Sequence, residues 1–563
     1  MPTDPIVPTV VAKILRGLVV AGSVALVALF AYVVAARFAI PIELEWMGGT
    51  VLDHVERFVQ GKPIYAAPTV DWIAYIYTPL YYWVSGTLAR AVPVLLACRV
   101  VSLVATLGAS ALVWRLARRL GASHVWAIAA VGCFYGAYSL TGYWYDLERA
   151  DTLCTLMVLA GTSIAIDSTG LVGAVIAGLV LGLAFYAKQQ ALGVALSVGV
   201  GLLVAGERRR ALGFALGAAV GLVPLFAWLH TSTGGWFDFY CVKMGAAHGV
   251  DLSLFTLFFL GDLSNAFALA AATFAVLAWL VRDTWQRVEA KRYDASDKRL
   301  VVFACALGGA FVASASSRLH QGGFLNVLIV WSTFGCVAFA IAATRVEQLA
   351  QSHGMGPLAG AGLSLAALLQ LAHFAYDPSE PTPSHHAEFD ANLLEARVHE
   401  LEKSGEVLLT GRGHVTTQRH FHIMALMDVM RGGLGIPDEI ASAIRSRRYA
   451  AYILDEWPEL TLEVMMGHRS ELFDIVLSNY YVAERWDDRE SDGIVGRHVH
   501  PTWVLKPRAQ PIVGATFEQL DRRRTIEAGL AEERMRQRQA GVPLPADAPT
   551  TEQAAATILD EKH

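Results

Sequence analysis

The sequence has few charged residues for its length. Only 17% of its 563 residues are Asp, Glu, Lys or Arg, whereas 54% are hydrophobic and the mean hydropathy is +0.42. An average globular domain carries about 25% charged residues, so this balance excludes an ordinary soluble enzyme. The sequence also has no stripe of basic residues, and nucleic acid is therefore not an expected partner.

Cysteine is scarce as well. The six cysteines lie mostly in or at the ends of apolar runs, and the polar carboxy-terminal region has none. Disulfide bonds are therefore not part of the expected design. His414, His420 and His422 lack the spacing of a zinc site, as does every cysteine. No cofactor is certain from the sequence, and a divalent metal stays an open alternative.

Long apolar runs fill the first two-thirds of the chain. They are roughly 16–26 residues long, which is the length that a helix needs to cross ~30 Å of hydrocarbon. The run at 76–92 is left out, because Pro79, Arg90 and the tyrosines at 75, 77, 81 and 82 make it a better interfacial or re-entrant helix. We predict eleven spans, at 14–38, 96–116, 124–142, 152–167, 171–187, 190–205, 211–229, 256–281, 300–316, 323–344 and 356–376.

The basic residues between these runs are distributed unevenly. With the amino terminus inside, the inner segments hold fifteen Lys and Arg residues and the outer segments nine, as the positive-inside rule requires. Counting 76–92 as a span would place the basic clusters at 208–210 and 282–299 outside. We therefore predict a multi-pass protein of the plasma or inner membrane, embedded in the lipid bilayer, with its carboxy-terminal region extracytoplasmic.

The region after residue 376 is more polar and is expected to fold by itself. Apolar stretches at 405–410 and 449–454 are typical of short buried strands, with helices at about 418–431 and 437–448, and stretches near 475–483 and 501–506 could complete the sheet. The predicted fold class is an all-α polytopic membrane bundle of about eleven transmembrane helices plus juxtamembrane helices, with a small C-terminal α/β extracytoplasmic domain. The expected boundaries are 1–376 for the bundle, 377–508 for the α/β domain and 509–563 for a charged, disordered or loosely helical tail.

The predicted outer loops carry charged residues of both signs. A carboxylate at the mouth of a helical bundle can take a proton from an acceptor, and cations beside it can hold a phosphate at headgroup depth. Each residue taken alone is also explained as a solvated loop residue, a snorkelling anchor or part of an aromatic belt. The acidic candidates are Glu43, Glu45, Asp146, Glu148 and Asp151, and the candidate binding residues are Tyr77, Tyr81, Arg149, Lys188, Gln189, Arg318 and His320.

Several short motifs follow one another along residues 10–345. An acidic pair comes after the first span, and a helix after it is closed by Gly-Lys-Pro-Ile-Tyr at 61–65. In order, these stretches resemble the GT-C membrane glycosyltransferases, the class of protein O-mannosyltransferases and lipid A aminoarabinose transferases. The other motifs are Tyr-Thr-Pro-Leu-Tyr-Tyr at 77–82, Arg-Val-Val-Ser at 99–102, Ala-Arg-Arg-Leu-Gly at 117–121, Asp-Leu-Glu-Arg-Ala-Asp at 146–151 and Gly-Leu-Ala-Phe-Tyr-Ala-Lys-Gln at 182–189.

The resemblance implies a helical membrane bundle that uses a polyprenyl-phosphate sugar donor and inverts the anomeric centre. Glu45 or Glu43 matches the general base of that family, and Lys188 and Arg318 match positions that meet the lipid phosphate. Many members have Asp-Glu or Asp-Asp where this chain has Glu-Leu-Glu, so the choice of glutamate and the dependence on a metal stay open. Asp146, Glu148 and Asp151 fall where the family has a second acidic group.

The leading hypothesis is a glycosyltransferase that moves a sugar from a polyprenyl phosphate to a protein, lipid or glycan acceptor at the outer face. The alternative is a transporter or flippase for a lipid-linked or anionic substrate. A transporter predicts ionisable residues near mid-membrane and related halves, whereas this sequence has few central charges and no internal repeat. A membrane-anchored binding protein would need far fewer spans.

Overall fold

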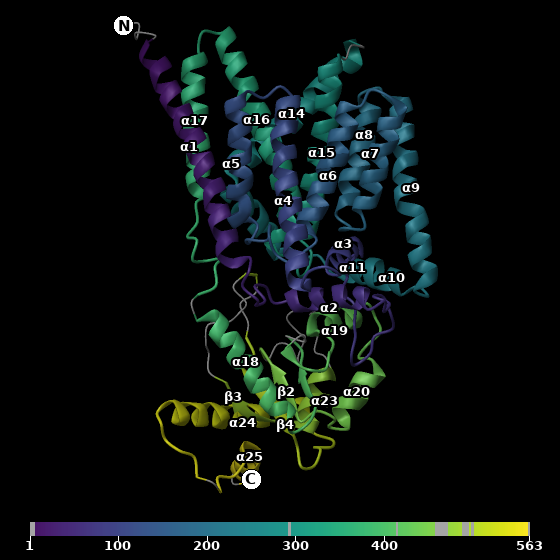
Figure 1. The fold of residues 1–563 in the computed structure, drawn as a ribbon, viewed down its shortest axis with the longest axis vertical. Helices are drawn as coiled ribbons and strands as arrows, with labels where there is room; N and C mark the ends of the chain where they lie inside the picture. The colour runs from purple at the N-terminus through teal and green to yellow at the C-terminus, as the bar shows by residue number, and fades with distance from the viewer. Residues whose placement is uncertain are drawn as a thin grey trace. The chain divides into compact units, whose positions relative to one another are not determined.

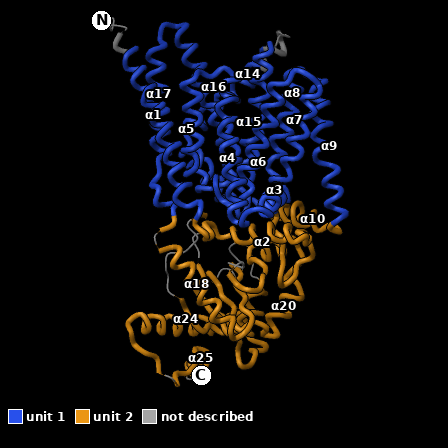
Figure 2. Tube along the Cα trace, in the orientation of Figure 1, with its two compact units in different colours: residues 1–39, 77–232, 249–382 blue, residues 40–76, 233–248, 383–563 orange. Residues whose placement is uncertain are grey.

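The computed structural model describes residues 6–290, 294–384, 386–411, 415–456, 471–486, 495–496, 500–545 and 547–560. The chain divides into two compact units, shown in two colours in Figure 2. Unit 1 comprises residues 1–39, 77–232 and 249–382, and unit 2 comprises residues 40–76, 233–248 and 383–563. The chain therefore passes between the units five times, and each unit is assembled from segments that are distant in sequence.

Unit 1 is a bundle of helices (Figure 1). Each of the eleven predicted spans overlaps one of its described helices. These helices are α1 (Ile6–Arg37), α4 (Val94–Arg119), α5 (His124–Leu140), α6 (Asp151–Asp167), α7 (Leu171–Ala184), α8 (Ala191–Val204), α9 (Arg208–Ser232), α14 (Phe267–Ala290), α15 (Ala295–Arg318), α16 (Ile329–Ser352) and α17 (Gly356–His373).

The chain is a multi-pass integral membrane protein. Among the described residues, five helices are long and apolar enough to cross a membrane, and a sixth span results if the pair Ser253–Asn265 and Phe267–Asp283, bent by 102°, is counted as one. Helices α5, α7 and α8 are apolar but have only 14–17 residues, a length of about 21–26 Å at 1.5 Å per residue. The count of eleven spans therefore stays a prediction.

The run at 76–92 contains the short helix α3 (Leu80–Leu88), which begins directly after Pro79. Nine helical residues rise only about 13 Å, less than half the thickness of the hydrocarbon core. The decision not to count this run as a span is confirmed.

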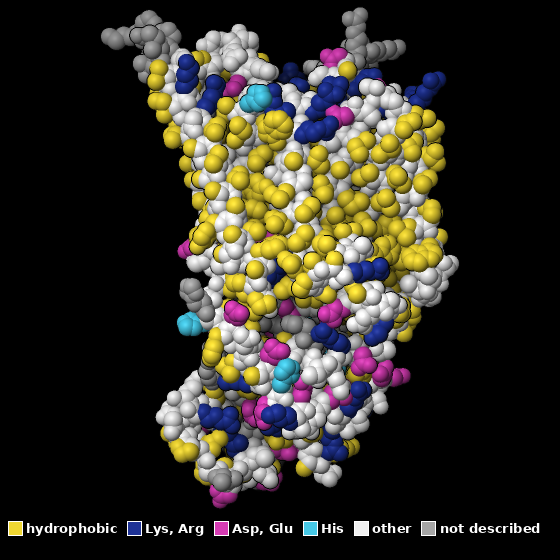
Figure 3. Space-filling model, in the orientation of Figure 1, with side chains coloured by type: hydrophobic (Ala, Val, Ile, Leu, Met, Phe, Trp, Pro, Cys, Tyr) yellow, Lys and Arg dark blue, Asp and Glu magenta, His cyan; other side chains and the backbone are white. Residues whose placement is uncertain are grey.

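Large apolar side chains cover the outside of unit 1. On α9, Leu212, Leu216, Val220 and Val223 recur at helical spacing and are all more than half exposed. Figure 3 shows hydrophobic side chains as a broad band over this unit. A continuous apolar surface of this kind indicates contact with lipid.

Glycine allows α7 and α9 to pack at very short range. Gly178 and Gly182 on α7 face Gly217 and Gly221 on α9, so both helices carry the small-xxx-small spacing of close helix pairs in membranes. A methyl group added at Gly217 would lie 2.0 Å from the carbonyl oxygen of Val175, and one at Gly178 would lie 2.0 Å from that of Phe214. The backbones therefore meet where no larger residue fits.

Unit 2 contains a small mixed sheet. Within the described residues its four strands run in the order β1-β2-β4-β3, with β1 (Val407–Leu409) parallel to β2 (Ala451–Leu454) and β4 (Trp503–Pro507) antiparallel to both β2 and β3 (Tyr480–Arg485). The strands expected near 407 and 451 are present. The helices of this unit are α2 (Gly48–Val59), α10 (Trp236–Asp238), η1 (Phe239–Met244), α11 (Gly245–Ala247), α18 (Ala387–Glu402), α19 (Ile423–Arg431), α20 (Asp438–Arg445), α23 (Glu471–Asn479), α24 (Phe517–Gln539) and α25 (Thr551–Asp560).

Helix α24 occupies much of the segment that was expected to be disordered or loosely helical. It begins with a capping box in which Thr516 and Gln519 satisfy each other's backbone N–H groups. Glu527 on this helix is fully buried, pairs with Arg508 at 2.7 Å and accepts a hydrogen bond from the backbone N–H of Val482 on β3. The helix is therefore tied to the sheet by a buried ion pair.

The close contact of α7 with α9 can be tested by paired glycine substitutions. Gly217→Ala forces the two backbones apart and should lower the unfolding midpoint of the purified protein. Gly362→Ala on α17 meets nothing within 4 Å and should leave the midpoint unchanged or raise it, because alanine favours a helix by about 1 kcal/mol over glycine. Thermal unfolding in detergent measures both. Equal effects of the two substitutions would contradict the assigned packing.

Candidate functional site

The loop between α5 and α6 in unit 1 and the first residue of α6 provide three acidic side chains, and a cation meets each of them. Asp146 is buried and accepts two hydrogen bonds from the guanidinium of Arg37, at 2.9 and 2.5 Å. The hydroxyl of Tyr138 donates a third to the same carboxylate at 2.8 Å. Arg37 also donates to the carbonyl oxygens of Tyr143 and Pro381, both at 2.8 Å. Asp146 therefore fastens this loop to the end of α1.

Glu148 is paired in a similar way with Arg99 on α4. The guanidinium Nε lies 3.4 Å from the Glu148 carboxylate, and both side chains are almost fully buried. The same guanidinium donates to the carbonyl oxygens of Arg37 and Phe38, at 3.2 and 3.0 Å. The C-terminal end of α1 is thus held both by α4 and by the loop between α5 and α6.

Asp151 has a different partner set. It is the first residue of α6, where the helix dipole favours a negative charge. The ammonium of Lys188, in the turn between α7 and α8, lies 2.5 Å from its carboxylate, and the side-chain amide of Asn326 donates to the same oxygen at 2.9 Å. The sequence predicted both Asp151 and Lys188, and the structure brings them together.

The second predicted cation, Arg318, is the last residue of α15. It forms an ion pair with Asp262 at 2.7 Å and donates to the carbonyl oxygen of Gly323 at 2.7 Å. One turn earlier, Ser314 accepts a hydrogen bond from Gln190 at 3.2 Å, and Gln190 comes two residues after Lys188. The turn that holds Lys188 therefore packs against the end of α15.

Asn326 and Asp262 were not identified from the sequence. Each is an isolated polar residue within an apolar stretch, and this is the signal that could have revealed them. Gln189 is half-buried, and its neighbour Gln190 donates hydrogen bonds to Ser314 and to the carbonyl oxygen of Val327. His320 is half-buried and forms a backbone bridge with Val250.

The remaining predicted residues of unit 1 are Arg149, Tyr77 and Tyr81, and the first two are in contact. Its guanidinium lies 5.1 Å from the centre of the Tyr77 ring and 4.4 Å from that of Trp144, and it donates to the Tyr77 hydroxyl at 3.0 Å. Tyr81 is buried instead, and its hydroxyl donates to the carbonyl oxygen of Cys98 at 2.9 Å. Tyr81 therefore packs α3 against α4, while Tyr77 and Arg149 form a cation–π contact.

Glu43 and Glu45 belong to unit 2, where both are buried. The Glu45 carboxylate accepts a hydrogen bond from the backbone N–H of Met47 at 3.1 Å. The segment is held on both sides, because the Val495 N–H donates to the Leu44 carbonyl at 2.8 Å and the Trp46 indole donates to Asp455 at 2.9 Å. The first loop is thus an integral part of the unit that also contains the sheet.

His54 on α2 supports the same loop. Its Nε2 accepts a hydrogen bond from the backbone N–H of Tyr75 at 2.9 Å, and its Nδ1 lies 2.6 Å from the carbonyl oxygen of Thr50. Burial lowers the pKa of His54 to about 3, so the ring is neutral, with the proton on Nδ1. This histidine joins α2 to the end of the loop rather than acting as an acid.

No metal site is evident in the part of the chain that the structure describes. There, no group of three His, Cys, Asp or Glu side chains could hold a metal ion. His414 lies outside the described residues, while His422 caps α19 by accepting from the Met424 N–H at 3.1 Å.

The fold can be compared with that of solved proteins. Two crystal structures of ArnT from Cupriavidus metallidurans match this chain, one bound to undecaprenyl phosphate and one in the apo state. The first has a TM-score of 0.52 at 12% sequence identity, and the match covers 87% of this chain and 98% of the ArnT chain. The second has a TM-score of 0.51 at 14% sequence identity, and the match covers 87% of this chain and 97% of the ArnT chain. The fold is similar to that of ArnT.

ArnT is an aminoarabinose transferase of the GT-C class. The resemblance inferred from the sequence motifs is therefore confirmed for the fold. Neither a protein-family model nor a curated protein matches the sequence. With 12–14% identity, the likeness to ArnT establishes the architecture of this chain and leaves its donor and acceptor to be inferred.

The bonding around Asp146 predicts a structural rather than a chemical role. Asp146→Ala leaves the Arg37 charge buried without its partner, which costs about 3–5 kcal/mol. The unfolding midpoint should fall sharply. Asp167→Ala is the matched control, since Asp167 pairs with Arg115 and Arg119 but is partly exposed, and exposed pairs are worth about 0–1 kcal/mol. A fully stable Asp146→Ala protein would contradict this assignment.

Proposed function

We propose that this protein is a membrane glycosyltransferase that transfers a sugar from a polyprenyl-phosphate donor to an acceptor at the outer face of the membrane. The observation that carries the proposal is the fold shared with ArnT over 87% of the chain, with one of those structures bound to undecaprenyl phosphate. A divalent metal is not required by the chemistry proposed below.

The donor phosphate is proposed to meet Lys188 and Arg318. Both cations are held by a carboxylate, Lys188 by Asp151 and Arg318 by Asp262. An ammonium has three N–H donors and a guanidinium has five, so each retains donors for a phosphate. Hydrogen bonds in which a partner is ionised are roughly twice as strong as those between neutral groups. Such bonds would stabilise the negative charge of the phosphate as it leaves.

The proposed base is Glu45, with Glu43 as the alternative. In the reaction, an acceptor hydroxyl oxygen forms a bond to the anomeric carbon while the bond from that carbon to the phosphate oxygen breaks. The hydroxyl proton passes to the carboxylate, and the polyprenyl phosphate leaves with the bonding electron pair. Attack from the face opposite the phosphate would invert the anomeric centre.

The membrane orientation is part of the proposal. Ion pairs join Arg16 with Glu347, Arg115 with Asp167 and Lys298 with Glu207, and these residues all come from loops or helix ends that the charge distribution assigns to the inside. The proposed outer end carries the Asp146, Glu148, Asp151 and Arg318 contacts. Unit 2 would then be extracytoplasmic, because its three segments follow α1, α9 and α17, whose C-terminal ends are assigned to the outside. The number of transmembrane helices would be eleven.

Removal of the proposed phosphate-binding cations should weaken use of the donor. Lys188→Ala and Arg318→Ala each delete charge-assisted hydrogen bonds worth about 1.5–3 kcal/mol, so we expect the donor KM to rise roughly 10- to 100-fold. Steady-state kinetics of the purified enzyme with a polyprenyl-phosphate sugar measures this change. Lys298→Ala, which removes an ion-paired lysine at the proposed inner end, should leave the donor KM unchanged. Equal donor KM values in all three variants would reject phosphate binding by Lys188 and Arg318.

Substitution of the base should abolish transfer without loss of the fold. Glu45→Gln keeps an oxygen that can accept from the Met47 N–H but cannot take the acceptor proton, so kcat should fall ~10²–10⁴-fold. Glu43→Gln is the companion variant, and Glu388→Gln, an exposed site on α18, is the neutral control. If Glu43→Gln alone loses kcat, the base is Glu43. Near wild-type turnover in both would move the acid–base role to Asp151 or remove the glycosyltransferase proposal.

A further inference from the structure

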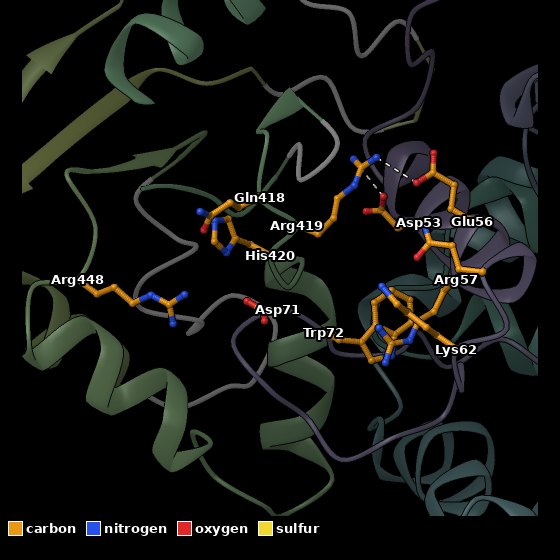
Figure 4. Close-up of a pocket in the computed structure, with 11 residues that line it drawn as sticks. Asp53, Glu56, Arg57, Lys62, Asp71, Trp72, Gln418, Arg419, His420 and Arg448 are labelled. Carbon is orange, nitrogen blue, oxygen red and sulfur yellow. Dashed lines mark hydrogen bonds and ion pairs between the residues drawn. The ribbon is translucent and has the colours of Figure 1, made fainter. Parts of the chain in front are cut away.

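Unit 2 contains a polar pocket that the proposed reaction has not used. Its volume is about 550 Å³, and its lining comes from α2, the rest of the first loop, residues 418–420 and Arg448. Figure 4 shows Asp71 between Arg448 on one side and Trp72 on the other. Nearly every lining residue has a charged or amide side chain. A pocket of this size is large enough for a ligand of several rings.

The lining is organised by contacts between residues of opposite charge. Arg419 lies 3.3 Å from Asp53 and 3.1 Å from Glu56. Arg448 donates two hydrogen bonds to Glu406, at 2.6 and 3.0 Å. Arg57 lies 4.5 Å from the centre of the Trp72 ring. These contacts hold the long side chains in defined positions around the cavity.

The chemistry of the pocket requires both hydrogen-bond donors and acceptors in its ligand. Arg57, Lys62, Arg419 and Arg448 offer only donors, whereas Glu56 and Asp71 offer only acceptors when ionised. Gln60 and Gln418 supply both kinds of group. A sugar hydroxyl donates and accepts at the same oxygen, so a polyhydroxylated ring can satisfy all of these groups.

Simpler ligands fit this lining less well. A metal ion would need a cluster of three ligating side chains, and none occurs among the described residues. A small anion would face the carboxylates of Asp53, Glu56 and Asp71. Burial raises the pKa of Asp53 to about 7, with Arg419 opposing the shift and Glu56 adding to it, so this carboxyl is partly protonated near neutral pH and can donate as well as accept.

The pocket is connected with the proposed base through two elements of unit 2. Asp53 and Glu56 lie on α2, which begins three residues after Glu45. Residues 418–420 line the pocket. His422, two residues further along the chain, packs on Trp46, and the two ring centres lie 5.0 Å apart. From Gly48 to Asp53 the helix rises only about 8 Å.

We propose that this pocket is a saccharide-binding subsite that holds a neutral, hydroxyl-rich glycan portion of the acceptor. The proposal rests on the function proposed above and narrows its acceptor to a glycan. The pocket would anchor one part of the acceptor, while another part presents the attacking hydroxyl to Glu45 or Glu43.

The test is direct glycan binding by the full-length protein in detergent, on a printed array of neutral, amino, carboxylated and phosphorylated oligosaccharides. We expect wild-type protein to retain a subset of neutral oligosaccharides. Arg448→Ala and Gln418→Ala should weaken this binding about tenfold or more, because each removes hydrogen bonds to the ligand. Arg445→Ala, at an exposed arginine on α20 outside the pocket, should bind as wild type.

Other results would overturn the assignment. Retention of only phosphorylated or carboxylated glycans, displaced by inorganic phosphate, would make the pocket an anion site. Absence of glycan binding, or binding unchanged in Arg448→Ala and Gln418→Ala, would show that the pocket holds no saccharide. Glu45→Gln should still bind the array, because Glu45 does not line the pocket. Loss of transfer activity and loss of glycan binding are thus separate failures of separate proposals.

Discussion

Charges that lie away from water must be paired, and this requirement organises the polar end of unit 1. Three carboxylates of one loop meet three cations from different parts of the bundle: Asp146 with Arg37, Glu148 with Arg99, and Asp151 with Lys188. The cost of leaving any one of these charges unpaired is several kcal/mol. The loop can therefore adopt its conformation only when α1, α4 and the α7–α8 turn are all in place.

The same requirement explains which parts of the site could be predicted. The sequence indicated the acids and cations, because charged residues between apolar runs are conspicuous and their order matches a known pattern. It did not indicate their pairing. Asp146 and Asp151 look alike in sequence, yet the first binds an arginine 109 residues away and the second a lysine 37 residues away. Contacts over such separations depend on how the helices pack, which local patterns do not encode.

The set of chain segments that make up unit 2 could likewise be predicted only in part. Short apolar stretches predicted the strands around 407 and 451, because a short buried strand is a local feature. That residues 40–76 and 233–248 fold together with the carboxy-terminal segment was not predicted, since each lies far from that segment in the sequence. The joining contacts include the hydrogen bond of Tyr240 to the Ala66 carbonyl and the pair of His248 with Asp428.

The different bonding of the acidic candidates also bears on their chemical roles. Asp146 accepts from both nitrogens of a buried guanidinium and from a tyrosine, so a proton added to it would break a buried ion pair. Glu45 instead accepts a backbone N–H at one oxygen, in a segment fixed on either side by Leu44 and Trp46. The bonding of Asp146 therefore gives it the task of keeping the loop in place, and this is why the base proposed above is Glu45 or Glu43 rather than Asp146.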